Sequence, residues 1–103
     1  MDSSTDLDTD VITKSQTHVQ HPKLYAVVMH NDNYTTMDFV VFVLMTVFEH
    51  SLDEAFELMM QIHHAGRAVV ATLPYDIAEM KVDEVTMLAE QEQFPLLTTI
   101  EPA

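Results

Sequence analysis

The feature that most constrains this chain is the block 39–48 (FVVFVLMTVF), in which Thr46 is the only polar residue. A membrane-spanning helix needs roughly 20 apolar residues, so this block is too short for a span and should be buried in protein. Thr35 and Asp38 stand three residues apart just before it, like the capping box that starts a helix. We therefore expect a helix over about 36–49 that is buried over most of its circumference.

The residues directly before this helix are polar. Asn31, Asp32 and Asn33 follow the apolar run 24–29 (LYAVVM), which is typical of a β-strand. A polar loop placed against the most apolar segment of a small protein indicates the mouth of a pocket. Such a pocket would bind a group with one charged end and one apolar end.

Local signals divide the rest of the chain into strands and helices. Ser51 and Glu54 form a second capping box, and Gly66, the only glycine, stands where that helix would end in a left-handed residue. Pro74 suits the start of a third helix. The expected strands are 24–29, 68–73 and 96–100, and the expected helices are about 36–49, 51–66 and 75–92.

This order of elements, β-α-α-β-α-β, predicts the fold class. We expect an α/β two-layer sandwich, with a three-stranded antiparallel sheet covered by three helices on one face. Residues 1–22 are polar and acidic, and we expect a disordered N-terminal extension ahead of a folded core at 23–103. The first residues lack the features of a secretory signal, and the chain has no cysteine, so we expect a cytoplasmic protein.

The charge of the chain excludes several kinds of partner. The formal net charge is −13, with only four basic residues, Lys14, Lys23, Arg67 and Lys81. Binding to nucleic acid requires clustered Lys and Arg, and anionic membrane surfaces require the same. We therefore expect no nucleic acid and no membrane among the partners, but cationic groups, apolar groups or proteins with a basic patch.

The chain also has few residues suited to catalysis. Cysteine is absent, the Gly-x-Ser-x-Gly elbow is absent, and one glycine cannot make a phosphate-binding loop. His63 and His64 are adjacent, so on a helix they point about 100° apart and cannot hold one ion as an i,i+4 pair does. These absences favour a binding module without a cofactor or metal over an enzyme. A small metal-dependent enzyme using His30, Asp32 and His63 remains the alternative from another class.

Two sets of apolar residues at helical spacing could form the wall of the pocket. Met37 and Val40 share one helix, and Met59 and Ile62 share a face of the next. From the spacing alone, simple core packing is a better explanation than a pocket, and a histidine on an apolar face is commonly structural. The pocket hypothesis depends on the whole set, in which Asn31, Asp32 and His63 make a polar rim over the apolar wall.

Three separated motifs resemble a known family. The stretches "HNDNYTTMDFV", "LMMQIHHAGRAVV" and "FPLLTTIE" resemble, in the same order, motifs of the ClpS adaptor family of bacteria. The resemblance covers about residues 23 to 101, nearly all of the predicted core. It implies the fold described above and an adaptor that is not an enzyme.

What the resemblance implies is recognition of N-degrons. Such adaptors bind protein substrates whose first residue is Phe, Tyr, Trp or Leu and deliver them to a ClpA-type AAA+ unfoldase with the ClpP protease. By position, Asn31, Asp32 and His63 would hold the α-amino group. The side-chain pocket would be lined by Thr35, Met37, Val40, Met59, Ile62 and Leu96, and Met37 would exclude β-branched first residues.

The resemblance also implies a docking surface. Asp76 and Lys81 match positions that dock on the N-terminal domain of the unfoldase, which would engage the acidic extension during delivery. We expect the adaptor to be a monomer. A domain of the same fold that docks another helix or peptide, with the N-degron pocket unused, is the alternative among binding proteins.

The chain departs from the family pattern at four positions. Asn33 replaces a second Asp near the ammonium, and Thr36 replaces Pro at the helix start. Ile62 replaces Val in the pocket, and the added methylene is expected to shift preference among the bulky first residues. His64 stands where an aromatic or another residue is common, and the resemblance implies no role for it. None of these departures removes the pocket as a hypothesis.

Overall fold

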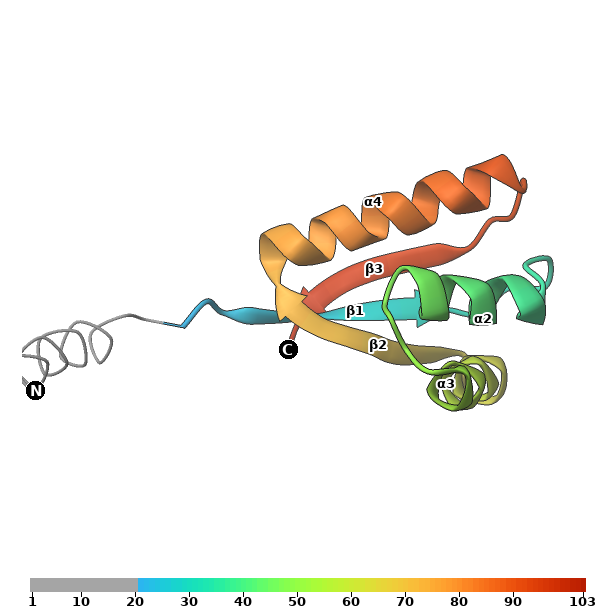
Figure 1. Cartoon of the computed structure of the whole chain (residues 1–103), viewed down its shortest axis with the longest axis horizontal. Helices are drawn as coiled ribbons and strands as arrows, with labels where there is room; N and C mark the ends of the chain where they lie inside the picture. Colours follow the sequence, from blue (N-terminus) through green and yellow to red (C-terminus); the bar gives the residue numbers. More distant parts are fainter. Residues whose placement is uncertain (1–20) are drawn as a thin grey trace, which may run out of the picture.

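The computed structural model describes residues 21–103. The predicted extension 1–22 therefore lies outside the described residues, apart from His21 and Pro22, which are exposed and belong to no helix or strand. The elements are β1 (Leu24–His30), α2 (Met37–Thr46), α3 (Leu52–Ala65), β2 (Arg67–Pro74), α4 (Tyr75–Gln91) and β3 (Leu97–Pro102). This is the predicted order (Figure 1).

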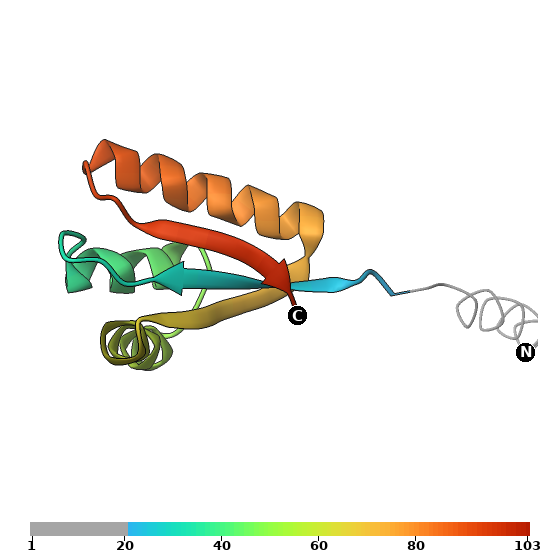
Figure 2. The same cartoon turned by 180° about the vertical axis from the view of Figure 1, so that it is seen from behind.

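The sheet is antiparallel, as predicted, and β1 is its central strand. The strand order is β2-β1-β3, and Val27 of β1 lies opposite Ala71 on one side and Ile100 on the other. The pairing of β1 with β2 is irregular between Val27 and Val28. Seen from behind, the strands lie in front of α2 (Figure 2), so the sheet and the helices form the two predicted layers.

The core lies between the sheet and the helices. Val27 and Met29 of β1, Val43 and Leu44 of α2, and Val85 of α4 are fully buried. Packing of α4 against all three strands and of α3 against β2 closes this layer. Burial of a large aliphatic side chain stabilises the fold by about 1.5–3 kcal/mol, so Val43 and Leu44 hold one face of α2 in the core. The prediction that this helix is buried over most of its circumference is wrong, because Phe42 and Met45 on its other face are 50% and 38% exposed. No helix among the described residues is long and apolar enough to span a membrane.

The start of α2 corrects one prediction. The N-cap is Thr36, whose hydroxyl accepts a hydrogen bond from the Phe39 N–H at 3.1 Å, and not Thr35. The sequence offers two neighbouring threonines, and the pattern does not choose between them. Thr35 is excluded as the cap because its amide and hydroxyl both bind Asp32.

The end of α2 corrects a second prediction. The helix ends at Thr46, three residues before the predicted end at Glu49. Glu49 has a φ of 60°, the left-handed conformation that ends many helices. The His50 N–H then donates to the Leu44 carbonyl at 3.1 Å. Because this left-handed residue is not glycine, the sequence carries no clear signal for the end.

The two ends of α3 agree with the prediction. Ser51 and Glu54 form the complete capping box, with each side chain accepting a hydrogen bond from the backbone N–H of the other residue. Gly66 follows the last turn with a φ of 92°. Its carbonyl accepts a hydrogen bond from the Asn31 N–H at 2.9 Å. This bond joins the end of α3 to the end of β1, where the polar loop begins.

Candidate functional site

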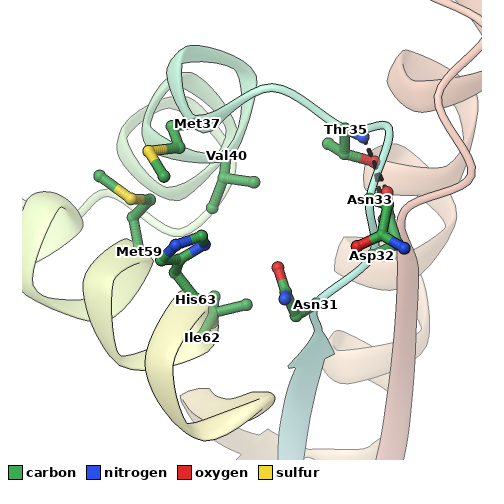
Figure 3. Close-up of a pocket in the computed structure, with 9 residues that line it drawn as sticks. All are labelled: Asn31, Asp32, Asn33, Thr35, Met37, Val40, Met59, Ile62 and His63. Carbon is green, nitrogen blue, oxygen red and sulfur yellow. Dashed lines mark hydrogen bonds between the residues drawn. The ribbon is translucent and has the colours of Figure 1, made fainter.

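A cavity of about 280 Å³ opens where β1, the following loop, α2 and α3 meet. Ligand pockets commonly measure about 300–1,000 Å³, so this cavity suits a single residue better than a larger ligand. Figure 3 shows the helix residues on one side and the residues of 31–35 on the other. The lining residues are Asn31, Asp32, Asn33, Thr35, Met37, Val40, Met59, Ile62 and His63.

The helix side of the cavity is apolar. Val40 of α2 and Met59 and Ile62 of α3 are exposed by only 6%, 5% and 2%. Met37, in the first turn of α2, is 45% exposed and so lies at the mouth. The two predicted sets of residues do face one another, and they form a wall that remains accessible from the cavity.

Asp32 anchors the polar side. One carboxylate oxygen accepts hydrogen bonds from the backbone N–H groups of Tyr34 (2.8 Å) and Thr35 (2.7 Å). The other oxygen accepts one from the Thr35 hydroxyl at 2.8 Å. Partial burial alone raises the pKa of Asp32, but these hydrogen bonds outweigh it and hold the pKa below its usual value. The carboxylate is therefore ionised at neutral pH.

Asn31 and His63 reach the cavity from opposite sides. Asn31 follows the last residue of β1, and its side chain extends toward the α3 side of the cavity (Figure 3). His63 lies in the last turn of α3, and its ring packs edge-on to that of His64 at 5.2 Å. The bond between Asn31 and Gly66 holds these two sides together. The predicted rim of Asn31, Asp32 and His63 thus lies in one cavity.

Leu96 is the one predicted pocket residue that does not line this cavity. It is 8% exposed and belongs to the buried core. Its neighbour Leu97 lies opposite His30 in the sheet, so Leu96 enters the core near the end of β1. Asn33 is the reverse case, because it lines the cavity although the prediction treats it only as a departure from the family pattern. Its position in the polar loop was the available signal.

The alternative metal site is not assembled. Among residues 21–103, no three His, Asp, Glu or Cys side chains are placed to hold a metal ion together. His30 belongs to β1, and its Nε2 lies 2.8 Å from the Thr99 hydroxyl of β3. His30 does not line the cavity that holds Asp32 and His63. The metal-dependent enzyme is therefore not favoured.

The predicted docking residues lie on α4, away from the cavity. Asp76 is exposed in the first turn. Lys81 is partly buried, and its ammonium donates a hydrogen bond to the Val47 carbonyl, at the end of α2, at 2.8 Å. A cation at the carboxyl end of a helix stabilises that helix, so this contact of Lys81 is structural. The sequence did not indicate it.

The fold and the cavity together define a class of protein. It is a small α/β binding domain whose pocket joins an apolar wall to a polar side with an ionised carboxylate. Such a pocket can hold a cationic group and an apolar side chain at once.

Comparison with known proteins identifies the family. The model of the ATP-dependent Clp protease adaptor protein ClpS matches residues 20–99, and the chain belongs to this family. The ClpS protein of Vibrio atlanticus is 42% identical over 92 residues, which are 89% of this chain and 87% of that protein. The ClpS protein of Wolinella succinogenes is 43% identical over 96 residues, with 93% and 92% covered.

A solved structure is similar in both fold and sequence. It is that of Agrobacterium tumefaciens ClpS2 bound to L-phenylalaninamide, with a TM-score of 0.77 and 46% identity. The match covers 81% of this chain and all of that one, 100%. The ligand of that protein carries a free amino group and an aromatic side chain.

Proposed function

We propose that this chain is a non-catalytic adaptor that binds the first residue of protein substrates when that residue is Phe, Tyr, Trp or Leu. The observation that carries the proposal is the cavity itself, with Val40, Met59 and Ile62 facing a polar side anchored by Asp32. L-phenylalaninamide, bound by a relative with 46% identity, has the two groups that such a cavity suits.

In this proposal, the polar side binds the substrate's α-ammonium. An α-amino group has a pKa of about 7.7–8.0 and is mostly cationic at neutral pH. The Asn31 side-chain oxygen and an unprotonated ring nitrogen on the His63 side chain are the kinds of group that can accept a hydrogen bond from it. Asp32 supplies the negative charge. An acetylated or internal residue has no such cation and leaves these polar groups without a partner.

The apolar wall binds the side chain of the first residue. Burial of a Phe or Leu side chain contributes roughly 1.5–3 kcal/mol, which adds to the contribution of the amine contacts. Ile62 has one methylene more than the Val that is usual in the family, so it leaves less space in the cavity for the substrate side chain. Met37, at the mouth, restricts which side chains enter. These roles, like those of the amine-binding residues, are assigned by position.

Delivery to a Clp protease follows from membership of the family. We propose a ClpA-like AAA+ unfoldase as the partner, with its N-terminal domain docked at Asp76 and Lys81. The adaptor would act in the cytoplasm as a monomer. The acidic residues 1–22 would be engaged by the unfoldase, and the described core would hold the substrate meanwhile.

The test compares two labelled peptides that differ only in a free or an acetylated Phe at the first position. Fluorescence anisotropy is expected to show tight binding of the free peptide alone. Asp32→Ala is expected to weaken this binding, whereas Asp38→Ala, which removes an exposed carboxylate outside the cavity, is not. Equal binding of both peptides, or of neither, would contradict the proposed function.

A further inference from the structure

Thr35 contacts Asp32 twice. Its backbone N–H donates to one carboxylate oxygen at 2.7 Å, and its hydroxyl donates to the other at 2.8 Å. Thr35 is half-buried and lines the cavity. The hydroxyl bond is the only one of the three bonds to this carboxylate that comes from a side chain, so it alone depends on the identity of residue 35.

These bonds determine which part of the carboxylate is left for a ligand. A carboxylate has about four acceptor positions. Two backbone bonds occupy one oxygen, and the Thr35 hydroxyl occupies one position on the other. The remaining position is on the oxygen that the Thr35 hydroxyl holds. The orientation of Thr35 therefore sets the orientation of the charge that faces the cavity.

Two other roles for the Thr35 hydroxyl do not fit the structure. It does not cap α2, because Thr36 accepts the hydrogen bond from Phe39. It does not belong to the apolar wall, because Val40, Met59 and Ile62 lie on the helix side of the cavity and Thr35 on the loop side (Figure 3). Its proton is given to Asp32.

We propose that Thr35 is a positioning residue, whose hydroxyl orients the Asp32 carboxylate toward the substrate's α-ammonium. Its place in the family pattern suggests instead a wall for the substrate side chain. The inference rests on the proposed function, and it adds that the residue after Tyr34 controls recognition of the amine. It also implies that Thr35 affects all first residues equally, since every substrate carries the same ammonium.

Two substitutions separate the positioning role from the wall role. Thr35→Val keeps the shape and removes the hydroxyl, and Thr35→Ser keeps the hydroxyl and removes the methyl group. For a positioning residue, T35V should weaken binding of a free-Phe peptide at least roughly tenfold, the lower end of the loss for a hydrogen bond to a charged group. T35S should restore most of that affinity. For a wall residue, T35S should instead weaken binding roughly fourfold, as for one buried methyl group, and T35V should not.

The experiment measures peptide anisotropy on the full chain, with free-Phe and free-Leu peptides. T35V is expected to weaken both peptides by the same factor, and to have no further effect when combined with Asp32→Asn, because the two residues act as a unit. Thr36→Val, which removes the α2 cap, is the control for disturbance of the helix start.

Each outcome decides the inference. It is overturned if T35S is the damaging variant, if T35V weakens binding equally in the Asp32→Asn background, or if T36V reproduces the loss. Absence of binding by the unsubstituted chain would instead contradict the proposed function. The two failures are therefore distinguishable.

Discussion

At the scale of single residues, Asp32 has a structural role beside its proposed role in binding. Its hydrogen bonds with Tyr34 and Thr35 close the loop between β1 and α2. The same bonds keep its pKa below the usual value against the effect of partial burial. The loop is thus most stable when the charge that would bind an ammonium is present.

This arrangement predicts a pH-dependent difference in stability. A group with a lowered folded-state pKa contributes stability above its ordinary pKa, and the contribution is lost as the pH falls through the folded-state pKa. Asp32→Asn should therefore lower the Tm by a constant amount from neutral pH down to about pH 4, the ordinary Asp value. Below that pH the difference should shrink. Thermal unfolding of both proteins in a buffer series measures it, and a difference that grows on acidification would refute it.

Met37 carries a second prediction at this scale. It is the most exposed of the apolar lining residues, at 45%, and stands at the mouth of the cavity. Met37→Ala should admit peptides that begin with Ile or Val, because the space near a branched Cβ is opened. Met80→Ala, on α4 and 64% exposed, is the matched control. Anisotropy with Ile-, Val- and Phe-starting peptides measures the change, and unchanged selectivity would rule out the proposal that Met37 excludes β-branched first residues.

At the scale of elements, the end of α3 supports the site. Gly66 ends the helix in the left-handed conformation one turn after His63, and its carbonyl binds the Asn31 N–H. The backbone of this turn therefore connects two of the residues assigned to the amine. An L-residue with a side chain is strained in this conformation whatever space surrounds it.

Gly66→Ala should therefore be destabilising without a clash. A Cβ at this position would meet nothing within 4 Å, but the φ of 92° is unfavourable for alanine. The expected loss in free energy of unfolding is about 1 kcal/mol. Gly66→Asn should cost less, because Asn tolerates left-handed backbone. Urea denaturation measures both, and equal stability of the alanine variant and the unsubstituted chain would contradict the strain argument.

The sequence predicts elements whose signals are local. Periodicity and the capping box of Ser51 identify α3, and Gly66 marks its end. The predicted end of α2 was wrong because the left-handed residue after the helix is Glu49. A glutamate, unlike a glycine, gives no sequence signal for this conformation. The last strand continues to Pro102, beyond the predicted end at Ile100, because β3 is an edge strand and tolerates proline.

The same limit applies to the site. Helical spacing and the family motifs correctly predict that Met37, Val40, Met59 and Ile62 lie in one cavity. This prediction is possible because α2 and α3 follow one another in the chain. The side-chain partners of Thr35 and Lys81 are tertiary contacts or turn contacts that spacing cannot assign. The sequence therefore predicts the positions of these residues better than their hydrogen-bond partners.

At the scale of the whole molecule, the described cations are all engaged within the fold. Among residues 21–103 these are Lys23, 5.8 Å above the Tyr25 ring, Arg67, 2.7 Å from Glu101, and Lys81, bound to the Val47 carbonyl. The net charge of the chain is −13. Such a molecule attracts cationic groups over its surface. Screening by salt should reduce this general attraction more than the contacts inside the cavity.

The acidic extension provides the prediction at this scale. Removal of residues 1–18 should leave peptide affinity unchanged, because the cavity is built from residues 31 to 63. Degradation of a Phe-starting substrate by the unfoldase and protease should slow. The two assays on the same truncated protein separate binding from delivery. If degradation proceeds at the normal rate, the extension only increases solubility.

The walls of the cavity belong to different parts of the chain, and this division affects how the protein can be redesigned. The apolar wall is made by helix side chains, and the anchored carboxylate belongs to the loop after β1. Under the proposed function, substitutions at Val40, Met59 or Ile62 should therefore change which side chain is accepted and leave the residues proposed to bind the amine in place. A panel of variants could share one amine-binding loop and differ only in the helices. Such a panel could distinguish peptides by the identity of their first residue.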